Sequence, residues 1–432
     1  MVETRLAFVF RQLTRKLWVR AVAFAVLGVA LVPLSRLTGT WLPESLRELT
    51  RADAVEGILN ILASSMLAVT TFSLSIMVAA YAGATASVTP RAVALLLQDR
   101  TSQTVLSTFI GAFLFSMVGI IALEAGAFGP PGVVMLFLAT VAVIALVVVA
   151  LIRWIDHLTQ FGRLGDTTDR VETATARALT ARGTRPALGG VPTGADAPPH
   201  GWRPLTATET GYLCHIDMPR LKTLTEGALL NRSGALLQLA CLPGSFLHPG
   251  SALLWMPPEM TDAMQAPLRA AFSIEKQRTF DQDPRFGLCV LSEIAERALS
   301  PAVNDPGTAI DVLGRAVRLL GAWQRAEPVE PDYPRILVPA LRLPDLFGDI
   351  FPAISRDGAT HYSVHMRLQK ALLALAQISP ADFGPEALAQ SARALEDARR
   401  AQTHGTELEN LAAVARQIEA AVGHPERPPR AL

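Results

Sequence analysis

The chain has 432 residues, half of them hydrophobic, and a formal net charge of +1. After Ile152 the chain holds 29 Lys and Arg against 31 Asp and Glu. This region is nearly neutral and lacks the excess of positive charge that binds nucleic acid, so we expect no nucleic-acid partner. Long apolar runs crowd the first third, whereas the remainder alternates apolar and charged residues. This placement predicts a membrane domain followed by a soluble region.

Four segments of the first third are long and apolar enough to cross a bilayer, since a spanning helix needs about 20 mostly apolar residues. They are Leu17–Leu34, Gly57–Tyr81, Thr104–Leu123 and Val133–Ile152. None carries a charged residue near its middle, which disfavours a proton-coupled pump or a voltage sensor. The residues after the first segment look like a helix exit rather than a cleavage site, so we expect a retained helix instead of a signal peptide.

Loop charge predicts the orientation of these helices. The segment through Arg20, the loop that holds Arg91 and Arg100, and the segment after the fourth helix are all basic. The loop between the first two helices carries four acids against three arginines. We therefore expect a multi-pass protein of the bacterial inner membrane with both termini in the cytoplasm. Trp41–Asp53 mixes Trp, Leu and charges and is predicted to be an amphipathic helix on the outer surface.

The second apolar segment has one polar face. Asn60, Ser64, Thr71 and Ser75 lie within about 60° of one another at 100° per residue. Such a stripe must face protein or water rather than lipid. Two interpretations remain open: hydrogen bonding between packed helices, or the wall of a polar pathway or pore.

A short helix, Pro90–Gln98, is predicted between the second and third segments, because a Thr-Pro pair favours a helix start. Arg91 and Arg100 would lie at the membrane interface, near lipid phosphates. This helix either anchors the topology or couples the membrane domain to the soluble region. In the third segment, Gly111 and Gly119 would let a neighbouring helix approach closely.

The soluble region begins, over residues 156–204, with a helix of about His157–Arg182 and a Gly- and Pro-rich flexible connector of about 183–204. A small β module is predicted over 205–258, and it either binds a small ligand or a partner or binds nothing. Alternation and turn residues place its strands and one helix; the strands are Glu209–Asp217, Gly234–Leu242 and Ser251–Met256, and the helix is Met218–Leu230.

Residues 259–432 are predicted to be helical. We expect helices over Glu259–Ser273 and Pro284–Leu299, and another that is capped near Asp305 or Pro306. Pro385–Val422 is predicted to be a helix pair broken near His404.

A polar cluster marks the start of this helical region. Its members are Arg278, Asp281, Asp283, Arg285, Asn304 and Asp305. Acids two residues apart with arginines nearby can bind metal or phosphate. They can equally form ion pairs that fix a loop, and Asn and Asp beside proline are common turn and cap residues. A structural or oligomer-contact role is the leading interpretation, and a ligand or ion site remains open.

The order of four motifs resembles a family of bacterial predicted membrane proteins with a domain of unknown function, number 2254. The motifs are SVTPRAVALLLQDRTSQTVLSTFIGAF (Ser87–Phe113), GYLCHID (Gly211–Asp217), RTFDQDPRFGL (Arg278–Leu288) and ALSPAVNDPGTAID (Ala298–Asp311). The resemblance covers about residues 10–420 and implies a four-helix membrane domain with a soluble C-terminal region. It implies no activity and no catalytic residues, and it argues against a soluble enzyme.

The remaining reactive side chains point to no chemistry. Cys214, Cys241 and Cys289 have no CxxC or zinc spacing and are expected to be structural thiols in a reducing compartment. His361 and His365 have the spacing of helical metal ligands, but acids are sparse nearby, so a surface or capping role is expected. Nucleotide-binding, nucleophile-elbow and kinase signatures are absent. We therefore predict no enzyme, no catalytic residue, no cofactor and no metal.

The predicted fold is a membrane α-helical domain of four transmembrane helices (residues 1–155), followed by a cytoplasmic α+β region with a small β module and a helical bundle. Two functions remain open. The helices anchor a cytoplasmic ligand- or partner-binding region, as in a membrane scaffold or sensor. Alternatively, the protein is a homo-oligomeric ion channel or conduction pathway lined by the second helix. The expected partners are the lipid bilayer, other copies of the chain, and a small ligand or protein partner of the cytoplasmic region.

Overall fold

The computed structural model describes residues 17–38, 51–87, 89–97, 99–160, 164–194, 197–228, 237–401 and 404–423. The chain divides into two compact units, residues 1–167 and 168–432.

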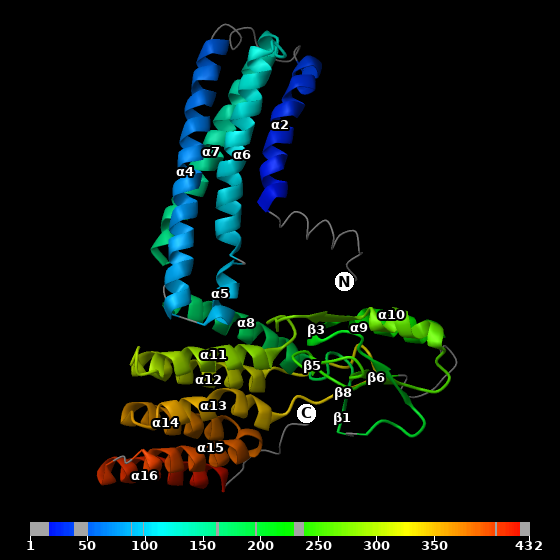
Figure 1. The fold of residues 1–432 in the computed structure, drawn as a ribbon, viewed down its shortest axis with the longest axis vertical. Helices are drawn as coiled ribbons and strands as arrows, with labels where there is room; N and C mark the ends of the chain where they lie inside the picture. The colour runs from blue at the N-terminus through cyan, green and yellow to red at the C-terminus, as the bar shows by residue number, and fades with distance from the viewer. Residues whose placement is uncertain are drawn as a thin grey trace. The chain divides into compact units, whose positions relative to one another are not determined.

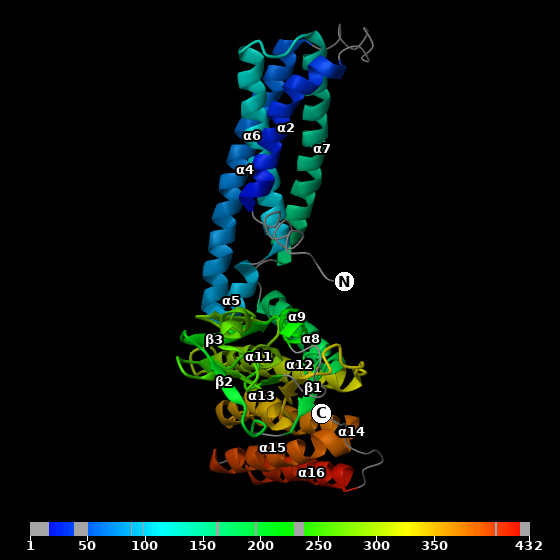
Figure 2. The same ribbon diagram turned by 90° about the vertical axis from the view of Figure 1, so that its right-hand side faces the viewer.

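The first unit is built from long apolar helices (Figures 1 and 2). Four of them are candidate membrane spans, and each contains one of the predicted apolar segments. The short helix predicted after Thr89 is also present, and the Thr89 hydroxyl accepts a hydrogen bond from Ala92 N at 3.4 Å. The helices are α2 (Leu17–Thr38), α4 (Ala52–Ser87), α5 (Pro90–Leu97), α6 (Arg100–Glu124) and α7 (Pro130–Gln160).

Helix α6 forms the centre of this unit and packs against α2, α4 and α7. Phe109 and Phe115 of α6 are fully buried in the core of the unit. Small residues allow the close packing: a Cβ on Gly111 would meet the Phe24 ring at 2.4 Å, and one on Gly119 would meet Leu59 at 3.1 Å. The predicted role of these two glycines is confirmed.

Two predictions on the flanks of these helices fall partly outside the described residues. Of the amphipathic segment Trp41–Asp53, only the last residues are described, and Ala52 and Asp53 belong to α4. The helix predicted over His157–Arg182 corresponds to the end of α7 and to α8 (Leu164–Thr184), with residues 161–163 between them outside the description.

The second unit contains two sheets (Figure 1). The larger has the strand order β1-β8-β4-β6-β2, with β8 parallel to both of its neighbours and the other pairs antiparallel. The smaller is antiparallel, in the order β5-β3-β7. The strands are β1 (Val191–Thr193), β2 (Arg203–Thr206), β3 (Gly211–Ile216), β4 (Leu237–Leu239), β5 (Phe246–Leu247), β6 (Ala252–Met256), β7 (Phe272–Glu275) and β8 (Ile336–Pro339).

Several sequence-based boundaries of this region are wrong. The segment 183–204, predicted to be a flexible connector, contributes β1 and begins β2. The helix predicted over Glu259–Ser273 is replaced by a 3-10 turn (Asp262–Met264), the short α10 (Gln265–Arg269) and β7. The sheets therefore draw on strands outside 205–258, because β1, β7 and β8 pair with strands distant in the sequence.

Apart from α9 (Met218–Ala228), which lies in the region of the strands, the remaining helices are stacked in layers beside the sheets (Figure 1). Helix α11 packs on α12 and α13, and α14 packs on α12, α15 and α16. Phe347, Phe351 and Phe383 are fully buried where these layers meet. The predicted helix starts at Pro284 and Pro306 are confirmed. The helices are α9 (Met218–Ala228), α11 (Pro284–Leu299), α12 (Pro306–Arg325), α13 (Leu343–Asp357), α14 (Tyr362–Ile378), α15 (Pro380–Arg400) and α16 (Gly405–Val422).

Candidate functional site

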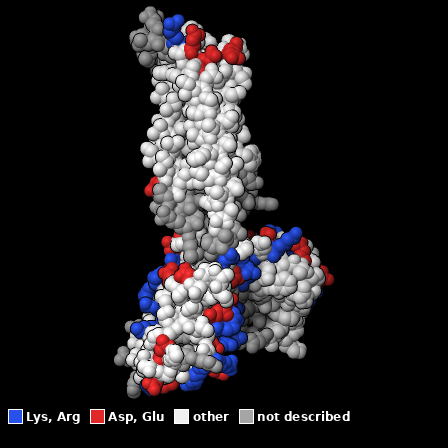
Figure 3. Space-filling view, turned by 60° about the vertical axis from the view of Figure 1, so that its left-hand side comes forward, with Lys and Arg blue, Asp and Glu red and all other residues white. Residues whose placement is uncertain are grey.

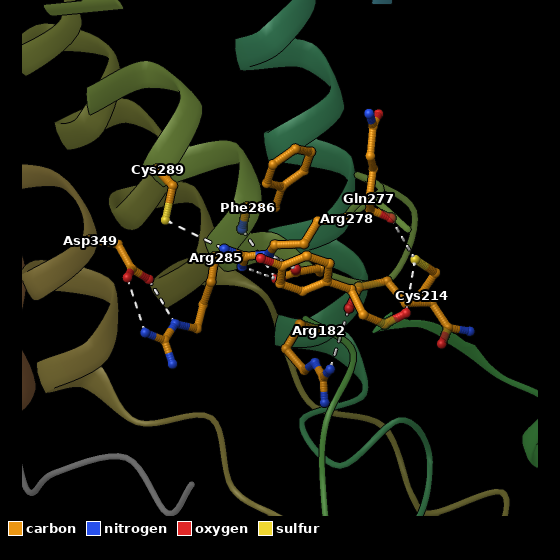
Figure 4. A network of polar contacts seen from close by, with 11 residues as sticks. Arg182, Cys214, Gln277, Arg278, Arg285, Phe286, Cys289 and Asp349 are labelled. Carbon is orange, nitrogen blue, oxygen red and sulfur yellow. Dashed lines mark hydrogen bonds and ion pairs between the residues drawn. The ribbon is translucent and has the colours of Figure 1, made fainter. Parts of the chain in front are cut away.

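Figure 4 shows a polar network at the start of α11 that includes Arg278, Phe286 and Cys289. Asp283 is at its centre through its bonds to Arg278 and to the backbone of Phe286. Its carboxylate accepts a hydrogen bond from Phe286 N at 3.1 Å and so caps the helix. It also receives two bonds from the guanidinium of Arg278, at 2.8 and 3.1 Å. The side chain of Asp283 is only 1% exposed. Two members of the predicted cluster, Arg278 and Asp283, therefore form one ion pair that fixes the loop before α11.

A glycine turn closes over this carboxylate. Gly244 has a φ of +99°, and a Cβ at this position would lie 2.4 Å from the Oδ2 atom of Asp283. Only glycine meets both demands, because it adopts positive φ at no steric cost and leaves room for the carboxylate. The turn between β4 and β5 thus belongs to the network.

Arg278 also contacts two neighbours on α11. Its Nη1 atom lies 3.8 Å from Sγ of Cys289, and its guanidinium lies 5.1 Å from the centre of the Phe286 ring. Burial, together with Asp349, raises the pKa of Cys289 to about 11, and burial raises the pKa of Cys241 to about 12. Both thiols are therefore protonated near pH 7 and poorly nucleophilic.

Arg285 lies in a second ion-pair group, between α11 and α13. It makes a two-bond contact with Asp349, at 2.7 and 3.0 Å, and a further bond to Asp345 at 3.1 Å. The sequence alone does not reveal these two acids as partners of Arg285. Asp349 and Asp345 are 64 and 60 residues from Arg285 along the chain, and only the folded helices bring them close. This contact joins two helices, and Cys289, which Asp349 influences and Arg278 contacts, connects it to the network around Asp283.

The other members of the predicted cluster lie elsewhere. Asp305 caps α12 by accepting from Thr308 N at 3.2 Å, and Asn304 is exposed in the left-handed conformation, with a φ of 49°. The 16 residues of α11 put this turn roughly 24 Å from Asp283 at 1.5 Å per residue. Asp281 is exposed. The six residues therefore form no single site.

Arg182 on α8 is the functional candidate that sequence reasoning did not identify. It is 4% exposed, and its guanidinium donates to the carbonyl oxygens of Pro186 and Gln282 at 3.4 and 3.5 Å. Burial lowers its pKa to about 10, with Asp283 acting in the opposite direction. The group therefore remains a cation near pH 7. A single buried arginine in a helix otherwise rich in Ala and Thr gives no spacing signal that could have found it.

Arg182 also borders a small pocket. The lining includes Pro186, Pro192, Trp323 and Leu341, so a single cation meets mostly apolar walls. Within the described residues, no group of three or more His, Cys, Asp or Glu side chains is placed to hold a metal ion. The chemistry that this arrangement offers is the binding of negative charge.

The polar stripe of α4 lies on the outside of the first unit. Asn60, Ser64, Thr71 and Ser75 are all exposed in the single chain. The three hydroxyls donate to carbonyl oxygens one turn earlier in the same helix, at 2.9 to 3.0 Å. The stripe is therefore at the surface, where lipid, water or a second copy would meet it.

The face of the first unit that Figure 3 shows is uncharged over most of its length. At one end of α6, Asp99 caps the helix through Ser102 N at 2.7 Å and lies 2.9 Å from Nε2 of His157 on α7. The two arginines predicted to be interfacial flank this cap in the sequence: Arg91 is exposed on α5, whereas the side chain of Arg100 lies outside the described residues.

The two histidines at helical spacing, His361 and His365, differ in position and burial. His361 occupies the N-cap position of α14 without a side-chain capping bond. His365 is buried, and its Nε2 atom lies 3.1 Å from the carbonyl oxygen of Ser355. The predicted surface or capping role is wrong for His365, because the next turn of α14 faces the helix layer beneath it.

Comparison with known proteins places the chain among membrane proteins. The family described as predicted membrane protein, DUF2254, matches residues 14–374. Uncharacterized proteins of Mycobacterium tuberculosis (strain CDC 1551 / Oshkosh) and Mycobacterium bovis (strain ATCC BAA-935 / AF2122/97) are each 29% identical over 304 residues, which cover 66% of this chain and 55% of each relative. The chain thus spans about half the length of the curated relatives it matches. No solved structure matches it.

Proposed function

Because the chain belongs to the DUF2254 family of predicted membrane proteins, we propose that it assembles in the bilayer into homo-oligomers and forms a conduction pathway for ions lined by α4. The observation that supports this proposal is the exposed polar stripe of α4. It lies within a candidate membrane span, Ala52–Gly83. Polar side chains that lie in the hydrocarbon of a bilayer are costly unless they meet protein or water.

Small residues share this side of α4. At 100° per residue they fall, with the polar residues, within about 80°, at the centre of the helix surface left uncovered by the same chain. Larger apolar side chains are exposed toward the edges, and Val78 is exposed within the stripe. Small side chains let the same helix of another copy approach closely. The small residues are Gly57, Ala68 and Ala82.

Asn60 sets the strongest requirement for a partner. The hydroxyls of the stripe are satisfied by the helix itself, whereas the Asn60 amide has no side-chain hydrogen bond to a described residue. An amide facing hydrocarbon without a hydrogen bond costs on the order of 2–7 kcal/mol. A ring of α4 helices around water would remove this cost, and the exposed Asp53 at the start of the same side would attract cations to the mouth.

Ion flux from liposomes that contain the purified protein tests the pathway. We expect potassium efflux from the native protein, and we expect Asn60→Leu and Thr71→Leu to reduce it at least about tenfold by replacing pore-lining polar groups. Phe72→Leu, at the exposed edge of the same helix, is the matched control and should conduct normally. A monomeric protein, or one without flux in any cation gradient, would exclude this function.

A second function is favoured by the pocket of Arg182: the helices anchor a cytoplasmic ligand-binding region, as in a membrane sensor. Four candidate spans put both flanking regions on the same side if all four cross the bilayer, and the basic loops favour the cytoplasmic side of an inner membrane. A green fluorescent protein fused to the C-terminus should fluoresce, and an alkaline phosphatase fused there should be inactive. An active phosphatase fusion would exclude this arrangement.

A further inference from the structure

The pocket beside Arg182 lies wholly within the second unit, between the end of α8, β1 and the C-terminal part of α12. Pro186, Pro192, Trp323 and Leu341 line it together with the arginine. Its enclosed space suits a group of about the size of a water molecule. The size of the pocket therefore restricts its ligand to a small group, whatever the charge of that group.

The charge balance around Arg182 is incomplete. No carboxylate of a described residue lies within ion-pair distance of its guanidinium, and its two hydrogen bonds, at 3.4 and 3.5 Å, are long. Asp283, the acid that influences it, is already engaged by two bonds from Arg278. A buried cation with five donors and two weak acceptors lacks a counter-charge.

We propose that this pocket binds one small, weakly hydrated monovalent anion, for which chloride is the physiological candidate. One guanidinium neutralises one negative charge, and the walls of proline, tryptophan and leucine offer little to replace a tightly held hydration shell. Divalent sulfate or phosphate would bring more charge and more bound water than the pocket accommodates. This proposal rests on the second proposed function, the ligand-binding region, and names its ligand. It does not depend on an ion pathway along α4.

Thermal unfolding of the full-length protein in nanodiscs tests the site. Sodium gluconate is replaced by sodium chloride or sodium bromide at constant ionic strength. We expect the halides to raise the unfolding midpoint by about 2–4 °C, since a ligand that binds only the folded state stabilises it. Bromide, which is larger but more weakly hydrated than chloride, should shift the midpoint in the same direction.

Two arginine variants locate the effect. Arg182→Gln should abolish the halide-dependent rise in the unfolding midpoint. Arg185→Gln, three residues later, is the matched control: Arg185 is exposed and pairs with Asp332 at 2.7 Å, so this variant should keep the full rise. A halide effect that survives in Arg182→Gln would contradict the proposal.

A second readout covers the case in which Arg182→Gln does not fold. Binding of chloride to the native protein should broaden the chloride NMR line, and added bromide should reverse the broadening by competition. A native protein that neither broadens the line nor responds to halides overturns the proposal. Loss of ion flux with the halide effect retained would remove the conduction pathway and leave the anion site intact.

Discussion

At the residue scale, Asp283 combines a helix cap with a buried ion pair. It caps α11 and holds Arg278 through two hydrogen bonds in a nearly inaccessible position. Asp305 caps α12 in the same way, through the backbone of the residue three positions later, but it is half-buried and pairs with no arginine in the described structure. The two acids thus separate the contribution of a cap from that of a buried ion pair.

We expect Asp283→Ala to lower the free energy of unfolding by about 3–5 kcal/mol, because it leaves Arg278 without its buried partner. Asp305→Ala should lower it by only about 1 kcal/mol, the usual contribution of a cap. Denaturant unfolding of both variants measures the difference. Equal losses would show that the ion pair adds nothing to the cap.

His365 gives the second unit a sensitivity to acid. Burial lowers the pKa of this histidine below its ordinary value of 6.5, and its Nδ1 atom has no hydrogen-bond partner among the described residues. As the pH falls below 6.5, the unfolded chain takes up a proton at this position before the folded chain does. Stability is therefore lost with decreasing pH, by at most about 1.4 kcal/mol per pH unit.

His365→Gln should flatten this dependence between pH 6.5 and the lower pKa of the folded state. Unfolding midpoints measured at a series of pH values provide the test, and His361→Gln at the start of the same helix is the control for loss of a histidine. If the wild type and His365→Gln lose stability with the same slope, His365 is not the group that titrates.

The sequence reveals those of these residues whose contact partners are close along the chain, and it does not reveal those whose partners are distant. Asp283 and Asp305 stand beside prolines at helix starts, and Arg278 is five residues from Asp283, so motif reading finds them. Arg182 contacts Gln282, which is 100 residues away. Such a contact depends on the packing of α8 onto the rest of the unit, which no short pattern encodes.

At the element scale, α8 and α11 approach each other closely. A Cβ added to Gly287 of α11 would lie 2.0 Å from the hydroxyl of Thr175 on α8, so only glycine fits there. Arg315 of α12 reinforces the position of α8 through bonds to Asp169 and Glu172, each at 2.6 Å. Together these contacts fix α8, which carries Arg182.

We expect Gly287→Ala to lower the free energy of unfolding by about 1–3 kcal/mol, because the new methyl group must push α8 away. Gly348→Ala is the matched control: this glycine lies within α13 and a Cβ there would meet nothing within 4 Å. The control should raise stability by up to about 1 kcal/mol, since alanine favours a helix. A neutral Gly287→Ala would show that the two helices are not in close contact.

The elements that the sequence predicts well are those whose signals are local. Apolar length identifies the long helices of the first unit, and Asp-Pro starts identify α11 and α12. The short strands β1, β7 and β8 have three or four residues each and too few positions to show alternation. Val191 pairs with Leu337, so β1 is a strand only because the fold brings a distant partner to it.

At the scale of the whole molecule, the first unit leaves the polar stripe of α4 on its outer surface. Its core is filled by aromatic and branched residues around α6, and the hydroxyls and the amide of α4 point away from that core. A monomer in the bilayer would turn Asn60 toward lipid, whereas an oligomer would turn it toward a neighbouring copy or toward water. We therefore expect copies of the chain to assemble through α4.

Disulfide cross-linking in membranes tests this claim most directly. Single cysteines are placed on α4 in a variant whose three native cysteines are replaced by alanine. We expect Ser64→Cys and Thr71→Cys, at the centre of the stripe, to form dimers rapidly on mild oxidation, and Phe72→Cys and Leu74→Cys, at its edges, to remain largely monomeric. Equal cross-linking at all four positions, or none at Ser64 and Thr71, would contradict the account.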